Sequence, residues 1–257
     1  MEIIASYYTD VGRTKQINQD SLSVKVVNSP KGKIVFAIVC DGMGGLEQGE
    51  LASKEVVVAM NRWFDTRFAK MVATNTVSEE LIYTQWRSEI DAVNDRLADY
   101  ARKQGLTLGT TVTALLTYQN QYYVCHVGDS RLYQVGNVLQ RITVDHTLVA
   151  QEVRMGIITE EQAKVDPRRS ILLQCVGAST VVEPQFDCGE LKDAVTFILC
   201  SDGFVHLVTE EELQQKFNPG ILSDKDTITS TCREMIRLVM NRGERDNITV
   251  VGIVVRP

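Results

Sequence analysis

Four aspartates of this 257-residue chain stand where an apolar, strand-like segment ends or begins. Each is followed directly by a small or polar residue, in the pairs Asp41-Gly42, Asp129-Ser130, Asp202-Gly203 and Asp246-Asn247. Because adjacent strands of one sheet bring such ends together, we expect these carboxylates to lie close to one another. Carboxylates in that position repel each other and lose hydration, and a hard divalent cation is the simplest compensating charge.

The donor atoms at these four positions are oxygens, which favour Mg²⁺ or Mn²⁺ over Zn²⁺ or Cu²⁺. Calcium is an alternative, but the chain has no Asp-x-Asp-x-Asp-Gly loop. Taken singly, each aspartate is also typical of a turn that follows a strand, because Asp is common in turns. Four such turns, each against a hydrophobic strand, favour a metal site.

A fifth aspartate, Asp20, ends a polar segment that also carries Arg13 and Lys15. Two cations so close in sequence to a further carboxylate predict an anion site that borders the metal site. The alternative is a polar loop that only connects two strands.

Strands and helices are expected in separate blocks along the chain. Strand-like segments rich in β-branched residues are expected at 3–9, 22–27, 34–40, 112–116, 122–127, 132–135, 138–142, 171–174, 195–200 and 248–255. Apolar residues at helical spacing and capping boxes predict helices at about 50–69, 79–103 and 148–155, after Thr159, after Thr209 and at about 226–241. The strands between 112 and 142 are expected to form one antiparallel meander. This block order indicates an α+β fold with antiparallel sheets.

Composition excludes several classes of protein. With 44% apolar and 23% charged residues the chain is of the ordinary globular type. Its net charge of −6 and the lack of a long basic run argue against a nucleic-acid partner. The N-terminus carries Glu2 where a signal peptide would be basic, and the apolar run 34–40 is too short to span a membrane. We therefore expect a cytoplasmic protein with no membrane partner.

The six cysteines form no Cys-x-x-Cys pair, so we expect reduced, mostly buried thiols and no zinc site. No linker or low-complexity tract divides the sequence, which favours a single domain over residues 1–257. The three histidines, His126, His146 and His206, are expected to have structural or surface roles.

The order and spacing of these motifs resemble the PP2C (PPM) family of metal-dependent Ser/Thr protein phosphatases, bacterial branch. The resembling segments are Thr9-Asp10-Val11-Gly12 through Asn18-Gln19-Asp20, Asp41-Gly42-Met43-Gly44-Gly45, Gly109-Thr110-Thr111, Gly128-Asp129-Ser130-Arg131-Leu132-Tyr133, Asp145-His146-Thr147, Ser201-Asp202-Gly203 and Arg245-Asp246-Asn247. Any one of these motifs is weak evidence. Together they extend over nearly the whole chain in the family's order.

The resemblance implies a PP2C-like α-β-β-α sandwich, in which helix pairs flank two antiparallel β-sheets. It implies a centre of two Mn²⁺ or Mg²⁺ ions, with Asp41, Asp202 and Asp246 on one ion and Asp41 with the carbonyl of Gly42 on the other. The position of Asp20 holds metal-bound waters in that family. The segment at about 148–169 corresponds to a flap near the active site.

Two further site assignments follow from the resemblance. Asp129 and Asp202 can bind a third, weaker ion in bacterial members. Lys15, with Arg13 close by, stands where the family commonly has an arginine that binds the substrate phosphate. Lysine keeps the charge but cannot bind two phosphate oxygens as a guanidinium does, so Arg13 is expected to carry part of the phosphate binding.

The implied reaction is hydrolysis of phosphoserine and phosphothreonine by a metal-bridging water. Two metal ions neutralise the phosphate and activate that water, so Asp41, Asp202 and Asp246 would act through it and no Cys or Ser nucleophile is required. The implied partners are phosphorylated proteins and an opposing Ser/Thr kinase, and the implied state is a monomer. Two alternatives stay open, a catalytically weak PP2C-fold binding or regulatory protein, and a phosphatase of a small phosphorylated metabolite.

Overall fold

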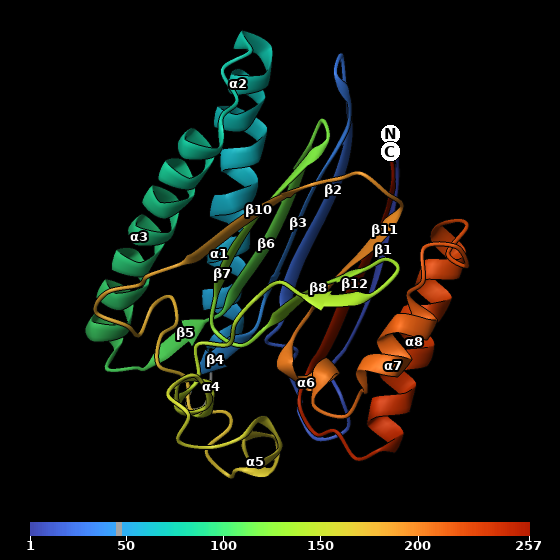
Figure 1. Cartoon of the computed structure of the whole chain (residues 1–257). Helices are drawn as coiled ribbons and strands as arrows, with labels where there is room; N and C mark the ends of the chain where they lie inside the picture. The colour runs from blue at the N-terminus through green and yellow to red at the C-terminus, as the bar shows by residue number, and fades with distance from the viewer. Residues whose placement is uncertain (45–47) are drawn as a thin grey trace.

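Two five-stranded antiparallel sheets form the centre of the fold in the computed structural model (Figure 1). The structure describes residues 1–44 and 48–257, so Gly45 of the Asp41 motif lies outside the described residues. The first sheet contains, in spatial order, β1 (Glu2–Asp10), β12 (Ile248–Arg256), β11 (Val195–Cys200), β8 (Arg131–Val135) and β9 (Leu139–Arg141). The second contains β10 (Gln185–Glu190), β7 (Gln121–Val127), β6 (Val112–Tyr118), β3 (Gly32–Cys40) and β2 (Ser21–Ser29). A short ladder joins β4 (Gly42–Gly44) to β5 (Leu108–Thr110).

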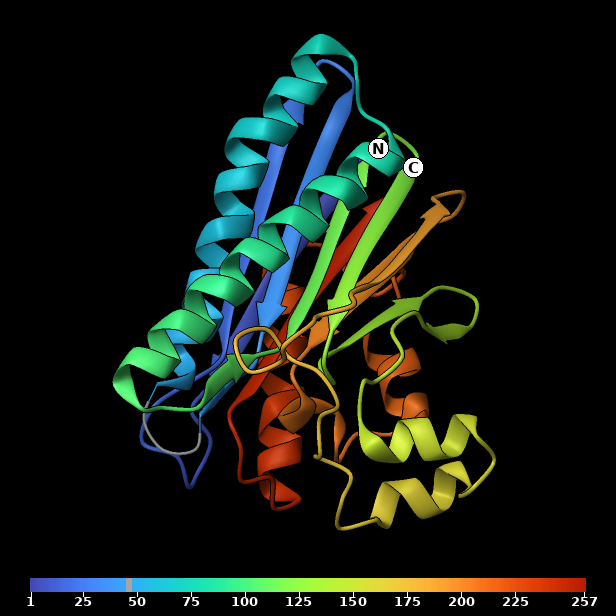
Figure 2. The same cartoon turned by 90° about the vertical axis from the view of Figure 1, so that its left-hand side faces the viewer.

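Helices cover the outer face of each sheet (Figures 1 and 2). Over the second sheet lie α1 (Gly49–Trp63), the π-helical turn η1 (Phe64–Phe68), α2 (Ala69–Thr74) and α3 (Glu79–Gln104). Over the first sheet lie α6 (Asp202–Val205), α7 (Glu210–Lys216) and α8 (Lys225–Asn241). Two short helices, α4 (Leu148–Arg154) and α5 (Glu160–Val165), lie beyond one end of the sheets. This arrangement confirms the predicted α-β-β-α sandwich.

Strand β3 shows why the central strands are apolar along their whole length. Side chains alternate between the two faces of a strand, so Ile34, Phe36 and Ile38 pack against the helices. Val35 and Ala37 point to the opposite face and join the cluster between the two sheets. A strand covered on both faces has no solvent-facing side for polar residues.

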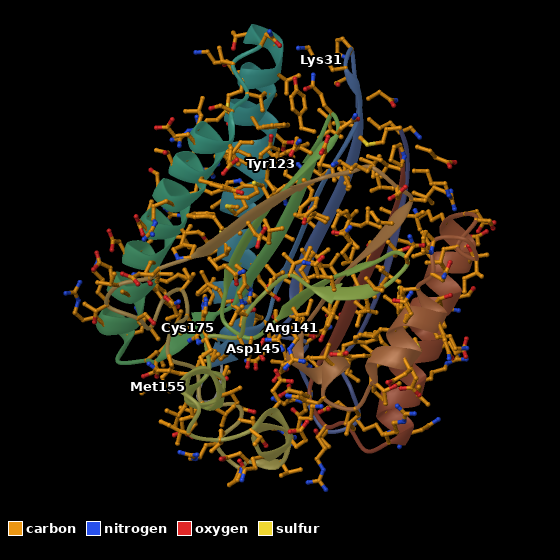
Figure 3. The ribbon with its side chains drawn as sticks, viewed as in Figure 1. Lys31, Tyr123, Arg141, Asp145, Met155 and Cys175 are labelled. Atoms are coloured by element: carbon orange, nitrogen blue, oxygen red, sulfur yellow. The ribbon has the colours of Figure 1, made fainter. Side chains whose placement is uncertain are left out.

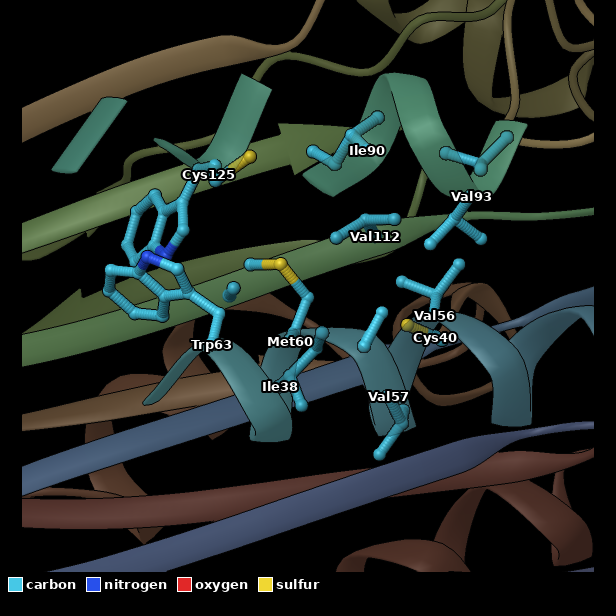
Figure 4. Close-up of a cluster of buried hydrophobic side chains, with 14 of the residues drawn as sticks. Ile38, Cys40, Val56, Val57, Met60, Trp63, Ile90, Val93, Val112 and Cys125 are labelled. Carbon is cyan, nitrogen blue, oxygen red and sulfur yellow. The ribbon is translucent and has the colours of Figure 1, made fainter. Parts of the chain in front are cut away.

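Helix α1 fits the second sheet through a stripe of buried side chains. Val56, Met60 and Trp63 lie against Ile38 and Cys40 of β3 (Figure 4). Burial of a Val, Met or Trp side chain of this kind contributes about 1.5–3 kcal/mol or more each. The packing fixes β3, and with it the residue that follows the strand, Asp41.

Two expectations about the elements are wrong. The segment 171–174 forms no strand and makes only isolated bridges, Thr147 to Leu172 and Thr110 to Val176. The strand of this region is β10, which begins eleven residues after Gln174. Ile171 and Leu173 are about half exposed and cover no sheet face. The predicted meander is also divided, since β6 and β7 belong to the second sheet and β8 and β9 to the first. The chain changes sheets at Gly128, whose φ of +105° favours glycine.

Helix ends are mostly as predicted. Thr159 and Thr209 form the predicted capping boxes of α5 and α7. Helix α3 begins at Glu79 as predicted, and its N-cap is Ser78, whose hydroxyl accepts the N–H of Leu81. The helix predicted at 50–69 continues through η1 to the end of α2. Among the helices of the described residues, none has the length and apolar content of a membrane span.

His126 of β7 is fully buried near the end of the second sheet. Its Nδ1 lies 3.0 Å from the hydroxyl of Thr113, while its Nε2 has no hydrogen-bond partner. Burial, with a smaller effect of neighbouring His146, lowers the pKa of His126 to about 3. The ring is therefore neutral in the folded protein over most of the acidic range.

We expect His126 to make the fold acid-sensitive. Between its ordinary pKa of 6.5 and about 3, the unfolded chain binds a proton that the folded protein does not. The free energy of unfolding should fall as the pH falls through this window, by up to about 1.4 kcal/mol per unit. Urea unfolding at a series of pH values, compared between wild type and His126→Gln, measures the contribution. An equally steep pH dependence in the variant would contradict it.

Candidate metal and phosphate site

Five aspartates gather at one end of the sandwich, and they come from both sheets. Asp20 directly precedes β2 and Asp41 directly follows β3, and these two strands pair from Ser21 with Cys40 onward. Asp202 follows β11, Asp246 precedes β12, and Asp129 lies in the link that changes sheets between β7 and β8. Adjacent strands of one sheet therefore bring Asp20 close to Asp41 and Asp202 close to Asp246, as expected, but one sheet alone does not bring all five aspartates together. The ends of two facing sheets do so.

Burial and neighbouring carboxyl groups raise the pKa values of Asp20, Asp41 and Asp129. Burial, followed by the charges of Asp20, Asp202 and Asp129, raises the pKa of Asp41 well above its usual range. Burial raises the pKa of Asp20 to about 7, together with the charges of Asp202 and Asp246 and against hydrogen bonds from Thr249 and Ser201. These mutual effects show that the five groups share one electrostatic site that lacks positive charge.

Two oxygens of the cluster have no hydrogen-bond partner although they are buried, Oδ1 of Asp20 and Oδ1 of Asp202. A buried carboxylate oxygen without a partner is costly. Hard divalent cations prefer oxygen ligands of this kind. The residues present therefore fit Mg²⁺ or Mn²⁺.

Lys15 supplies part of the missing positive charge. Its Nζ lies 2.9 Å from Oδ1 of Asp246, with both side chains about two-fifths exposed. That hydrogen bond is the main reason why the pKa of Lys15 is raised, and the charges of Asp41 and Asp202 add to it. In residues 1–44 and 48–257, no three acidic, His or Cys side chains enclose a space for an ion as they stand. Lys15 lies where cation binding to Asp246 would have to displace it.

Arg13 points elsewhere. Its Nη2 donates to Oδ1 of Asn241 at the end of α8, 2.7 Å away. The two cations that the sequence places together are thus separated in space, with Lys15 at the carboxylates and Arg13 at the helix.

Side-chain hydrogen bonds of Asn247 hold the N-terminal loop at the site. Its amide nitrogen donates to the carbonyls of Val11 and Ile17, at 2.9 and 3.1 Å, and its Oδ1 accepts the N–H of Gln19 at 2.9 Å. These bonds hold the loop that carries Lys15 beside the loop that carries Asp246. Sequence reasoning used Asn247 only as a motif member and missed this role.

Gly42 and Gly203 permit the closest backbone approaches of the site. A Cβ on Gly42 would overlap the carbonyl of Gly49, and one on Gly203 would overlap the carbonyl of Asn247. The N–H of Gly42 also donates to the carbonyl of Gln19 at 3.2 Å. Each glycine follows one of the aspartates, so its small size sets the position of the neighbouring carboxylate.

Ion pairs of Arg131 and Arg141 with the buried Asp145 support the turn that contains Asp129. Asp145 accepts bonds from Nε and Nη2 of Arg131, the shortest at 2.8 Å, and Nη2 of Arg141 lies 2.7 Å from its other oxygen (Figure 3 labels Asp145 and Arg141). Burial opposes ionisation, but the two guanidinium groups outweigh it and lower the pKa of Asp145. The motifs around Arg131 and Asp145 signalled both residues, though not their contact.

His146 joins the same turn to Leu173, which lies just beyond the segment predicted as a flap. Its N–H donates to the carbonyl of Gly128 at 2.7 Å, and its Nδ1 accepts the N–H of Gly128 at 3.2 Å. Its own carbonyl accepts the N–H of Leu173 at 2.8 Å. These bonds agree with the expected structural role of His146.

The chain resembles known proteins over nearly its whole length. A family model described as "Protein phosphatase 2C" matches residues 11–238. The chain is 35% identical over 251 residues to the serine/threonine phosphatase stp of Listeria monocytogenes, with 96% of this chain and 94% of that protein covered. It is 31% identical over 254 residues to the protein phosphatase PhpP of Streptococcus pneumoniae, covering 97% and 96%.

The chain also resembles solved structures over nearly its whole length. The serine/threonine phosphatase Stp1 of Staphylococcus aureus superposes with a TM-score of 0.83 at 26% identity, covering 100% of this chain and 96% of that one. The catalytic domain of the serine/threonine protein phosphatase PstP in complex with two manganese ions has a TM-score of 0.77 at 27% identity, covering 99% and 100%.

We expect Asp20 to make the metal-free protein less stable as the pH rises. The folded protein keeps a proton on Asp20 between the ordinary pKa of 3.8 and about 7, whereas the unfolded chain loses it. The free energy of unfolding should therefore decrease with rising pH in this window. In Asp20→Asn this contribution is absent, and equilibrium unfolding of metal-stripped protein should show the difference. Asp65→Asn, which changes a surface carboxylate paired with Lys25, is the control. Identical pH profiles for wild type and Asp20→Asn would refute the expectation.

Proposed function

The chain belongs to the protein phosphatase 2C family, and from this premise we infer that it is a serine/threonine protein phosphatase that requires Mn²⁺ or Mg²⁺. The observation that carries the proposal is the cluster of carboxylates from both sheets, with its two buried, unpartnered oxygens. Support for the metal comes from the relative whose structure holds two manganese ions. Support for the substrate class comes from relatives that are named serine/threonine phosphatases.

We propose that Asp41, Asp202 and Asp246 hold one ion, and that Asp41 and the carbonyl of Gly42 hold a second. Asp20 would accept hydrogen bonds from water at the ions, and Asp129 with Asp202 would hold a third, weaker ion. Two such ions would supply a nucleophilic water and offset the charge of the phosphoryl group.

Lys15 is proposed to bind the substrate phosphate. Its ammonium already lies among the carboxylates, 2.9 Å from Asp246. Neutralisation of Asp246 by a cation would leave Lys15 without that partner and able to donate to a phosphate oxygen. Arg13 would contribute long-range attraction only, since its guanidinium is bonded to Asn241.

The proposed substrates are phosphorylated proteins, opposed by a Ser/Thr kinase, and the proposed state is a monomer with one domain over residues 1–257. The proposed flap at about 148–169 lies in the chain between His146, which bonds Gly128, and Leu173, which bonds His146. It exposes Met155, Ile157 and Val165, all at least 60% accessible. Exposed apolar side chains on this segment favour a protein substrate over a small metabolite. The cytoplasm stays the predicted location, and the six unpaired cysteines agree with it.

Loss of one proposed metal ligand should abolish the activity. Metal-stripped protein should hydrolyse a phosphothreonine peptide only after Mn²⁺ or Mg²⁺ is added. Asp41→Asn and Asp246→Asn should each lower kcat/KM at least about 100-fold, because ligand charge and geometry are lost together. Asp65→Asn should behave as wild type. Full activity of both site variants would overturn the metal assignment, and metal binding without turnover in wild type would favour a binding protein.

Lys15 should affect substrate binding more than turnover. In Lys15→Met we expect KM for the phosphopeptide to rise about 10-fold or more, because a hydrogen bond between charged groups contributes about 1.5–3 kcal/mol. In Lys15→Arg we expect a lower KM than in wild type, since a guanidinium binds two phosphate oxygens. Steady-state kinetics at saturating Mn²⁺ provides the test. An unchanged KM in Lys15→Met would remove Lys15 from the phosphate site.

A further inference from the structure

A histidine and a glutamate connect the two loops of the first sheet that carry Asp202 and Asp246. The ring of His206, four residues after Asp202, has its Nε2 3.7 Å from Oδ2 of Asp202. Its Nδ1 lies 3.6 Å from Oε2 of Glu244. Both contacts are slightly longer than a hydrogen bond and within ion-pair distance. The imidazole thus lies between two carboxyl groups, one on each loop.

The second oxygen of Glu244 holds the backbone in front of Asp246. Oε1 accepts the N–H of Arg245 at 2.8 Å and that of Asp246 at 3.1 Å. A single side chain therefore fixes the turn that presents Asp246 and also faces His206. The contacts form a continuous path from the backbone of Asp246 through Glu244 and His206 to the carboxylate of Asp202.

This path is largely shielded from water. The side chains of His206, Asp202 and Glu244 are 20%, 16% and 10% exposed. Electrostatic contacts are stronger there than on an open surface, because little solvent screens them. The 3.6 and 3.7 Å contacts can therefore restrict the orientation of Asp202.

The backbones of the two loops are already fixed relative to each other. The N–H of Ser201 donates to the carbonyl of Thr249 at 3.1 Å, and Gly203 packs against the carbonyl of Asn247. The orientation of the Asp202 side chain is less constrained, since its Oδ1 has no hydrogen-bond partner. Among the described residues, His206 is the one basic side chain within 4.0 Å of that carboxylate. Its position can decide where the Asp202 oxygens point.

We propose that His206, held by Glu244, is a positioning residue that orients the carboxylate of Asp202 and keeps it at a fixed spacing from Asp246. It thereby sets the affinity and geometry of the divalent cation that these two aspartates share. The proposal rests on the proposed function, which places a cation at this pair. Groups that orient metal ligands from behind commonly change metal affinity 10- to 100-fold when they are removed.

The test measures metal binding directly. Metal-stripped wild type, His206→Ala, His206→Gln and Glu244→Ala are titrated with MnCl₂ by isothermal titration calorimetry, and the bound Mn²⁺ is examined by electron paramagnetic resonance. We expect the Kd of His206→Ala and Glu244→Ala to rise about 10- to 100-fold, with a broadened Mn²⁺ spectrum. His206→Gln should recover part of the loss, because its amide nitrogen can occupy the place of Nε2. Glu212→Gln is the matched control, since Glu212 bonds Arg242 nearby and contacts neither aspartate.

Three results would overturn the proposal. One is a wild-type Kd and spectrum in His206→Ala. Another is a lower melting temperature in that variant with unchanged Mn²⁺ binding, which would make the role only structural. The third is a His206→Gln variant that binds no better than His206→Ala. If wild type itself bound no Mn²⁺, the proposed function would fail instead, so the two failures are distinguishable.

Discussion

Repulsion among carboxylates that two sheets bring to one end of the sandwich is the constraint on which the rest of the site depends. Asp20 and Asp41 arrive from the second sheet, Asp202 and Asp246 from the first, and neighbouring carboxyl groups add to the burial that raises the pKa values of Asp20 and Asp41. A cationic side chain of the protein offsets part of this repulsion. Lys15 lies against Asp246. A divalent cation would neutralise the same charge more completely.

The scaffold holds this unfavourable arrangement because its strands are fixed on both faces. Alternate side chains of β3 enter the helix-covered core and the core between the sheets, so the strand has little freedom to retract Asp41. Hydrogen bonds and ion pairs hold the loops of the site in place. Asn247 ties the N-terminal loop to the Asp246 turn, and the Arg131 to Asp145 contact supports the turn of Asp129.

The sequence predicts most of the fold, since long apolar strands and capping boxes such as those at Thr159 and Thr209 are local signals. The sequence-based prediction fails where contacts between distant segments determine the structure. The apolar segment 171–174 finds no partner strand, and the switch of sheets at Gly128 leaves no periodic signature.

For the site, the spacing of the aspartates predicts the cluster, and the assignments of individual ligands stay predictions. Contacts such as Lys15 with Asp246 or His206 with Glu244 join segments far apart in the chain. Single-sequence reasoning carries no distance information of that kind. For this reason His206, expected to be structural or superficial, gained a candidate role only from its position between two carboxyl groups.

The origin of the clustered aspartates in both sheets has an evolutionary consequence. Interior side chains such as Phe197 and Val39 separate the two sheets and so determine how far apart the aspartates stand. A conservative substitution in that layer can therefore change the distances between the carboxyl groups although every acidic residue is retained. Relatives that retain every aspartate can thus differ in the spacing of these carboxyl groups through differences in their cores, which a comparison of motif residues alone would overlook.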